Sequence, residues 1–216
     1  MKLLVKISVF IMLGCATGSG KKASVKNPQS HDDTSEIQSS SNENQPISEA
    51  EKEFIKHCET ANCRRNVRIT LRQKDGSLFT YTNPLFPPIV QPGFITLLAG
   101  EKVYLEAAAD ENGPVNFKVV EKIENPEKTI TFRLNQNPNM GDGTGMILHV
   151  KNPFKRAIRY RLGMMVLESD NVYATSSCPV RAGISVMEMW QHPIFQLIFA
   201  EMRFIDEGKD DFSCRE

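Results

Sequence analysis

The stretch NVRITLRQKDGSLFTYT, residues 66–82, decides the fold class of this chain. Its first part, NVRITLR, alternates apolar with polar side chains, which is the period of a strand with one buried face. Asp75 and Gly76 follow, a pair typical of tight turns between antiparallel strands, and SLFTYT then returns as the second strand. The stretch therefore predicts a β-hairpin.

Similar runs fill the rest of the chain. Short segments rich in β-branched and aromatic residues, separated by turn residues, indicate an all-β fold, an Ig-like antiparallel β-sandwich. The expected strands are FITLL (94–98), KVYLEAA (102–108), VNFKVVEKI (115–123), KTITFRL (128–134), GMILHVKN (145–152), AIRYRLGMMVL (157–167), GISVMEMW (183–190) and IFQLIFAEMRF (194–204). The last run also fits a helical apolar face, but its phenylalanines and the preceding Pro193 favour a strand.

One short helix is expected before the strands. Ser48 and Glu51 have the spacing of an N-terminal capping box, in which each side chain bonds a free backbone N–H. The helix would extend to about His57 and turn Phe54 and Ile55 toward the core. We therefore expect the folded domain to span residues 48–216.

The first residues have the features of an export signal. Lys2 and Lys6 give a basic start, and the apolar run from Ile7 to Leu13 is too short to cross a membrane, which takes about 20 helical residues. The run ends in Met12-Leu13-Gly14-Cys15. This ending resembles the lipobox of bacterial lipoproteins, with Met12 at a position where that class usually has Leu.

The resemblance implies a signal peptide over 1–14 and a lipidated Cys15 as the first mature residue. Residues 15–47 are polar and lack large apolar side chains, so we expect a flexible tether with a root-mean-square span of roughly 30 Å. Ala16 follows Cys15, which in the Gram-negative members of the class implies sorting to the outer membrane. The expected location is the cell envelope, with the domain anchored to a lipid membrane and facing the periplasm.

Four cysteines remain in the predicted domain: Cys58, Cys63, Cys178 and Cys214. An even number of cysteines in an exported chain predicts disulfides. Three pairings are possible, and the sequence leaves them open. A zinc site is the alternative, but the spacing of Cys58 and Cys63 does not match the paired-cysteine motifs of such sites.

Composition narrows the function classes. Formal net charge is zero, and without a basic stripe we expect no nucleic-acid partner. The chain has four histidines, and we find no nucleophile elbow and no His-Glu-x-x-His motif. His149 should point outward from a sheet. We therefore predict a protein that is not an enzyme and holds no metal or cofactor.

Binding of a partner is the class of function that remains. The segment NPLFPPIVQPGF (83–94) is expected to be a loop between strands, stiffened by four prolines. It presents Leu85, Phe86 and Ile89, either to a partner or as a cap on the core. Trp190, the only tryptophan, either packs or stacks on a ligand. The leading hypothesis is a non-enzymatic module for protein interaction or envelope assembly. The alternatives are a module that binds glycan or a small ligand near Trp190, and a small periplasmic hydrolase or hydrolase inhibitor.

Overall fold

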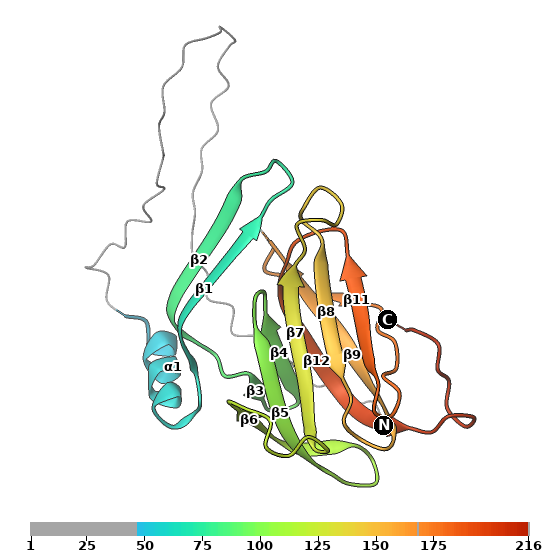
Figure 1. The fold of residues 1–216 in the computed structure, drawn as a ribbon. Helices are drawn as coiled ribbons and strands as arrows, with labels where there is room; N and C mark the ends of the chain where they lie inside the picture. Colours follow the sequence, from blue (N-terminus) through green and yellow to red (C-terminus); the bar gives the residue numbers. More distant parts are fainter. Residues whose placement is uncertain (1–46, 168, 216) are drawn as a thin grey trace, which may run out of the picture. The chain divides into compact units, whose positions relative to one another are not determined.

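The computed structural model describes residues 47–167 and 169–215. This part of the chain contains one helix and twelve strands (Figure 1). The elements are α1 (Glu49–Thr60), β1 (Arg64–Arg72), β2 (Leu78–Phe86), β3 (Val90–Gln91), β4 (Phe94–Leu98), β5 (Lys102–Ala109), β6 (Pro114–Val120), β7 (Thr129–Gln136), β8 (Met146–Lys151), β9 (Ala157–Val166), β10 (Tyr173–Thr175), β11 (Ser185–Trp190) and β12 (Ile194–Ile205).

Ten of these strands form two five-stranded antiparallel sheets. Sheet one has the order β10-β9-β12-β4-β3, and sheet two has the order β11-β8-β7-β5-β6. The chain changes sheet between β4 and β5, between β8 and β9, and on both sides of β11, as expected for a sandwich with Greek-key connections. The predicted antiparallel β-sandwich with a short N-terminal helix is confirmed.

The core lies between the two sheets. Alternate residues of each strand point inward, so that Leu105, Ile130, Leu134 and Leu148 are completely or almost completely buried. Rings from the two sheets meet in the middle, where the centroids of Phe132 and Phe199 are 4.7 Å apart. The alternation seen in the sequence thus corresponds to the faces that the strands bury.

The final apolar run is a strand along its whole length, as predicted. β12 pairs with β9 on one side and with β4 on the other, so it is a central strand of sheet one. Its inward residues Leu197 and Phe199 are almost fully buried. The helical alternative is wrong, because the backbone N–H and C=O groups of this run pair with β9 and β4 and are not free to form a helix.

α1 begins directly after Ser48, where the capping signal places its start. The expectation that Phe54 and Ile55 face the core is wrong, since Ile55 is 41% exposed and Phe54 is only half-buried. The reason is that half of the twelve residues of α1 are charged, which leaves the helix little apolar surface to bury. Its end is held instead by a disulfide between Cys58 and Cys63.

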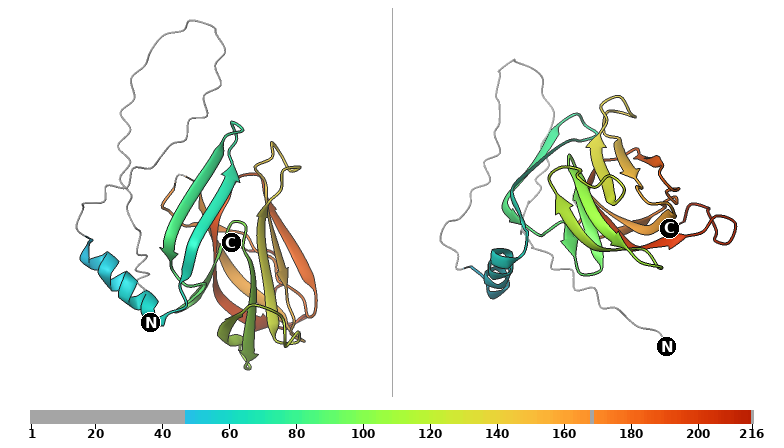
Figure 2. Two further views of the ribbon diagram at one scale, coloured as in Figure 1. Left: turned by 60° about the vertical axis from the view of Figure 1, so that its left-hand side comes forward. Right: turned by 60° about the horizontal axis from the view of Figure 1, so that its bottom comes forward.

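β1 and β2 form the predicted hairpin, which stands beside the two sheets in all views (Figures 1 and 2). Gly76 has a φ of 87°, and its N–H donates to Gln73 O at 3.0 Å, which closes the turn after Asp75. Only glycine enters this region of φ at little cost. The hairpin signal of the opening stretch is therefore confirmed.

The hairpin contacts the sandwich at its base, in its middle and near its tip. At its base, Arg64 reaches Thr96 of β4. In its middle, the ring of Tyr81 meets Phe195 of β12 edge-on, with centroids 5.1 Å apart. Near its tip, the side-chain amide of Gln136 bonds both the N–H and the C=O of Arg72.

The predicted signal peptide (1–14), Cys15 and all but the last residue of the predicted tether (15–47) lie outside the described residues. The described part contains no helix with the length and apolar character that crossing a membrane requires.

Candidate functional site

An apolar groove opens along one side of the sandwich, where the edge strands β3 and β6 face each other. It has a volume of about 260 Å³. Its floor is formed by the buried Ile95 and Phe199, and half-buried or exposed residues form its sides. We call this feature the β3–β6 groove; its sides are formed by Val90, Gln91, Gly93, Phe94, Phe117, Glu201 and Met202.

Two β-bulges border the groove, one in each sheet. In β6, Asn116 and Phe117 together oppose a single residue of β5, and in β12, Glu201 and Met202 oppose a single residue of β9. The first residue of each bulge has a positive φ, 53° for Asn116 and 51° for Glu201. A bulge re-aims the side chains of its strand, and here the second residue of each, Phe117 or Met202, lines the groove.

The remaining wall is a rigid turn. Pro92 and Gly93 join β3 to β4, and Gly93 has a φ of 87°, as the third position of a type II turn requires. The ring of Pro92 fixes the φ angle of that residue. Because Val90 and Phe94 flank this turn, their side chains are held beside the groove before any partner arrives.

Leu85, Phe86 and Ile89 precede β3 on the proline-rich segment, and none of the three lines the groove. All three are half-buried. Phe86 packs against Phe195, with ring centroids 6.5 Å apart, and Ile89 packs against the core. Phe86 and Ile89 therefore cap the core, which is one of the two roles predicted for the segment, and binding of a partner stays a prediction.

One part of that prediction needs correction. The segment was expected to be a loop throughout, whereas residues 83–86 continue β2 and Val90 and Gln91 form β3. A strand is possible because β2 belongs to a two-stranded hairpin and the ladder has no pair at Pro84.

Trp190 lies elsewhere, on β11 at the opposite end of sheet two. Its ring is half-buried, and its indole N–H donates to Thr175 Oγ1 of β10 at 3.0 Å. The tryptophan therefore closes the side of the sandwich between β10 and β11. The structure does not bring it together with Leu85, Phe86 and Ile89.

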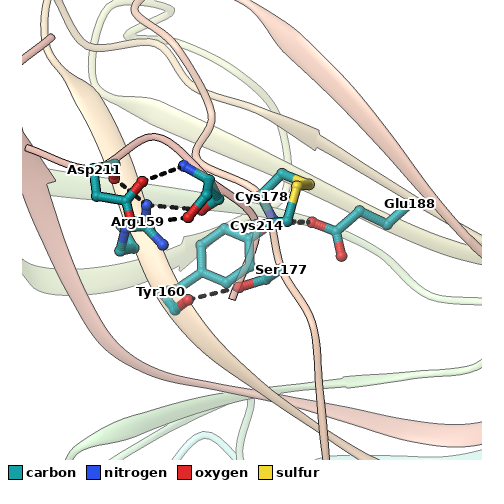
Figure 3. The surroundings of a disulfide bond; sticks show 8 residues. Arg159, Tyr160, Ser177, Cys178, Glu188, Asp211 and Cys214 are labelled. Carbon is teal, nitrogen blue, oxygen red and sulfur yellow. Dashed lines mark hydrogen bonds between the residues drawn. A yellow bond between two sulfur atoms is a disulfide. The ribbon is translucent and has the colours of Figure 1, made fainter. Parts of the chain in front are cut away.

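The second disulfide, Cys178–Cys214, joins the C-terminal tail to the segment before β11 (Figure 3). Both disulfides of the described domain thus form, and the pairing left open by the sequence is Cys58 with Cys63 and Cys178 with Cys214.

A half-buried carboxyl group, that of Glu188, lies beside this second disulfide. Glu188 accepts hydrogen bonds from Cys178 N–H at 3.2 Å and from the Tyr160 hydroxyl at 3.4 Å. Burial raises the pKa of Glu188, although the two hydrogen bonds oppose the shift, and burial together with Glu188 raises the pKa of Tyr160 well above its usual value. The pair sits inside the sandwich, so we assign it a structural role.

His149 lies on the outer face of β8 between the buried Leu148 and Val150, as predicted. The side chains of His57, His149 and His192 make no hydrogen bond or ion pair within the described residues. No group of three metal-binding side chains occurs in that part of the chain either. That the chain is not an enzyme and holds no metal or cofactor stays a prediction.

Two features of the site were missing from the sequence analysis, the bulges and the edge-to-edge position of β3 and β6. Asn116 is a weak signal of the bulge in β6, since asparagine enters the left-handed region of φ more often than most residues. Glu201 gave no such signal. No protein family, curated protein or solved structure matches this chain.

Proposed function

We propose that the chain is a lipoprotein of the bacterial cell envelope, anchored through an acylated Cys15, whose β-sandwich binds another envelope protein without catalysing a reaction. The β3–β6 groove carries this proposal. It is apolar, it lies on the proline-rich segment, and its walls are held by a turn and two bulges. A pre-ordered apolar surface loses little entropy on binding.

The size of the groove favours a protein partner over a free small ligand. Pockets for small molecules usually measure about 300–1,000 Å³ and bury most of the ligand. The β3–β6 groove, at about 260 Å³ and open along one side, fits one or two apolar side chains of an extended segment. The alternative site for glycan at Trp190 has less support, because that ring packs on Thr175.

Photo-crosslinking in intact cells tests the groove. A photoreactive phenylalanine replaces Phe117 in the groove or, as a matched control, Tyr173 in β10, whose side chain is 44% exposed. We expect a discrete protein adduct from position 117 that is absent from position 173 and that is lost when Met202→Lys places a charge in the groove. Equal adducts from both positions, or retention on a glycan resin without any adduct, would contradict the proposal.

Mass spectrometry of the mature N-terminal peptide tests the anchor. We expect acyl mass on Cys15, and we expect Cys15→Ala to release the protein from the membrane fraction. An unmodified Cys15 in the native protein would refute the anchor and leave the groove experiment unaffected.

A further inference from the structure

The hairpin of β1 and β2 carries an exposed basic face. Arg65, Arg68 and Arg72 of β1 and Lys74 of the turn are all exposed, and neither strand contains an Asp or Glu. We call these four residues the basic face. The formal charge of the whole chain is zero, but this hairpin gathers four cations locally, so the expectation of no basic stripe does not hold here.

Strand geometry places Arg68 and Arg72 in a row, whereas Arg65 precedes Asn66, whose φ of 52° interrupts the alternation. Arg68 and Arg72 are separated by Thr70, and alternate residues of a strand share one face at intervals of about 7 Å. Their partners across the ladder are Thr82 for Arg68 and Leu78 for Arg72. Leu78, at the tip, is 62% exposed. The face therefore combines guanidinium groups with one apolar side chain at its end.

The charges of the basic face are available to an outside partner. Arg64, the remaining arginine of β1, is bound inside the protein by Glu101. In contrast, no ion pair within the described residues includes a member of the basic face. Asp75, beside Lys74, is hydrogen-bonded to Ser77. Asp142 is hydrogen-bonded to Thr144 and interacts electrostatically with Lys74, so the three arginines are the charges most open to a partner.

We propose that the basic face docks on the anionic phospholipid headgroups of the membrane that holds the anchor. This inference rests on the proposed function for the lipid at Cys15. Charge complementarity favours it, because arginine forms paired hydrogen bonds with phosphate oxygens. The exposed Leu78 at the tip suits an interface between water and lipid.

The chain outside the described residues also points to a membrane. It leads from α1 back to Cys15, so the predicted anchor keeps the hairpin near lipid at an effective concentration in the millimolar range. Each cation near an anionic bilayer adds a modest attraction, and several together suffice at such a concentration. Docking would fix which side of the sandwich faces the membrane.

Vesicle co-sedimentation of the full chain tests this proposal. The chain carries Cys15→Ala, so that no acyl group contributes, and the vesicles are phosphatidylcholine with or without phosphatidylglycerol. The test variant is Arg65→Gln/Arg68→Gln/Arg72→Gln. The matched control, Lys102→Gln/Lys118→Gln/Lys151→Gln, removes the same charge from the exposed positions of sheet two.

We expect binding that requires phosphatidylglycerol, weakens with salt and falls on the order of 10- to 100-fold in the arginine variant, with little change in the lysine variant. Equal losses in both variants, or equal binding to both kinds of vesicle, would overturn the proposal. Retention on polyglutamate without vesicle binding would also overturn it, in favour of an acidic protein. Because Cys15 is replaced, these results do not depend on whether the native chain is acylated or whether its groove has a partner.

Discussion

Replacing Arg64 with methionine should detach the base of the hairpin from the sandwich. Only 7% of the Arg64 side chain is exposed, and its Nε lies 2.8 Å from Glu101 Oε1. One terminal nitrogen donates to Pro87 O at 2.8 Å, and the other donates to Thr96 O at 2.7 Å and to Glu101 Oε2 at 3.1 Å. Burial lowers the pKa of Arg64, and Glu101 opposes this shift.

The size of the effect follows from what Arg64→Met leaves behind. Glu101 loses its cation while its Oε2 still accepts from Leu98 N–H at 2.7 Å, and two carbonyl oxygens lose a donor. Breaking a buried pair from one side costs about 3–5 kcal/mol. In a domain of this size that loss lowers the melting temperature by roughly 10 °C, since each kcal/mol corresponds to about 2–4 °C.

Urea unfolding followed by the fluorescence of Trp190 measures this loss. Arg65→Met is the matched control, because Arg65 is the next residue, is exposed and has no ion-pair partner within the described residues. We expect it to change the free energy of unfolding by no more than about 0.5 kcal/mol. The double variant Arg64→Met/Glu101→Met should lose less than Arg64→Met, because no buried charge remains unpaired. The reasoning fails if Arg64→Met unfolds at the same urea concentration as Arg65→Met.

Three further predictions concern the interior. The pKa of Glu188 is raised in the folded state, so the wild type loses stability as this carboxyl group ionises above about pH 4.3. Glu188→Gln should therefore be increasingly more stable than the wild type as the pH rises above that value, and urea unfolding at several pH values measures the difference. Removing Cys178–Cys214 with a double alanine variant should cost about 4 kcal/mol, more than the roughly 2 kcal/mol for the shorter loop of the other disulfide. Asn152→Ala should cost about 3 kcal/mol, because its fully buried amide donates to three carbonyl oxygens.

One result would contradict each of these three predictions. A wild-type stability curve that runs parallel to that of Glu188→Gln from pH 4 to pH 8 would show that burial does not disfavour the charged form. Alkylation of Cys178 or Cys214 in the native, unreduced protein would show that this disulfide is absent. A melting temperature unchanged by Asn152→Ala would mean that water replaces the amide, which its 0% exposure argues against.

The sequence predicted the strands well because strand signals are local. Alternation in NVRITLR and the turn residues Asp75 and Gly76 lie within a few positions of one another, and they set the hairpin whatever surrounds it. The helix was placed correctly from its cap, but the direction of Ile55 was not, since a face can only be buried where another element covers it.

The amino-acid sequence by itself determined the class of this protein: an antiparallel β fold with four cysteines able to pair, behind a segment that resembles a lipoprotein signal. Only the tertiary structure decided where the two surfaces that we propose for recognition lie. The β3–β6 groove needs two edge strands from different sheets and bulges at Asn116 and Glu201. The basic face needs one arginine of β1 to turn inward to Glu101 while three stay outside. The groove and the basic face both depend on contacts between residues that are distant in the sequence. Local patterns of residues do not determine which distant strands pair.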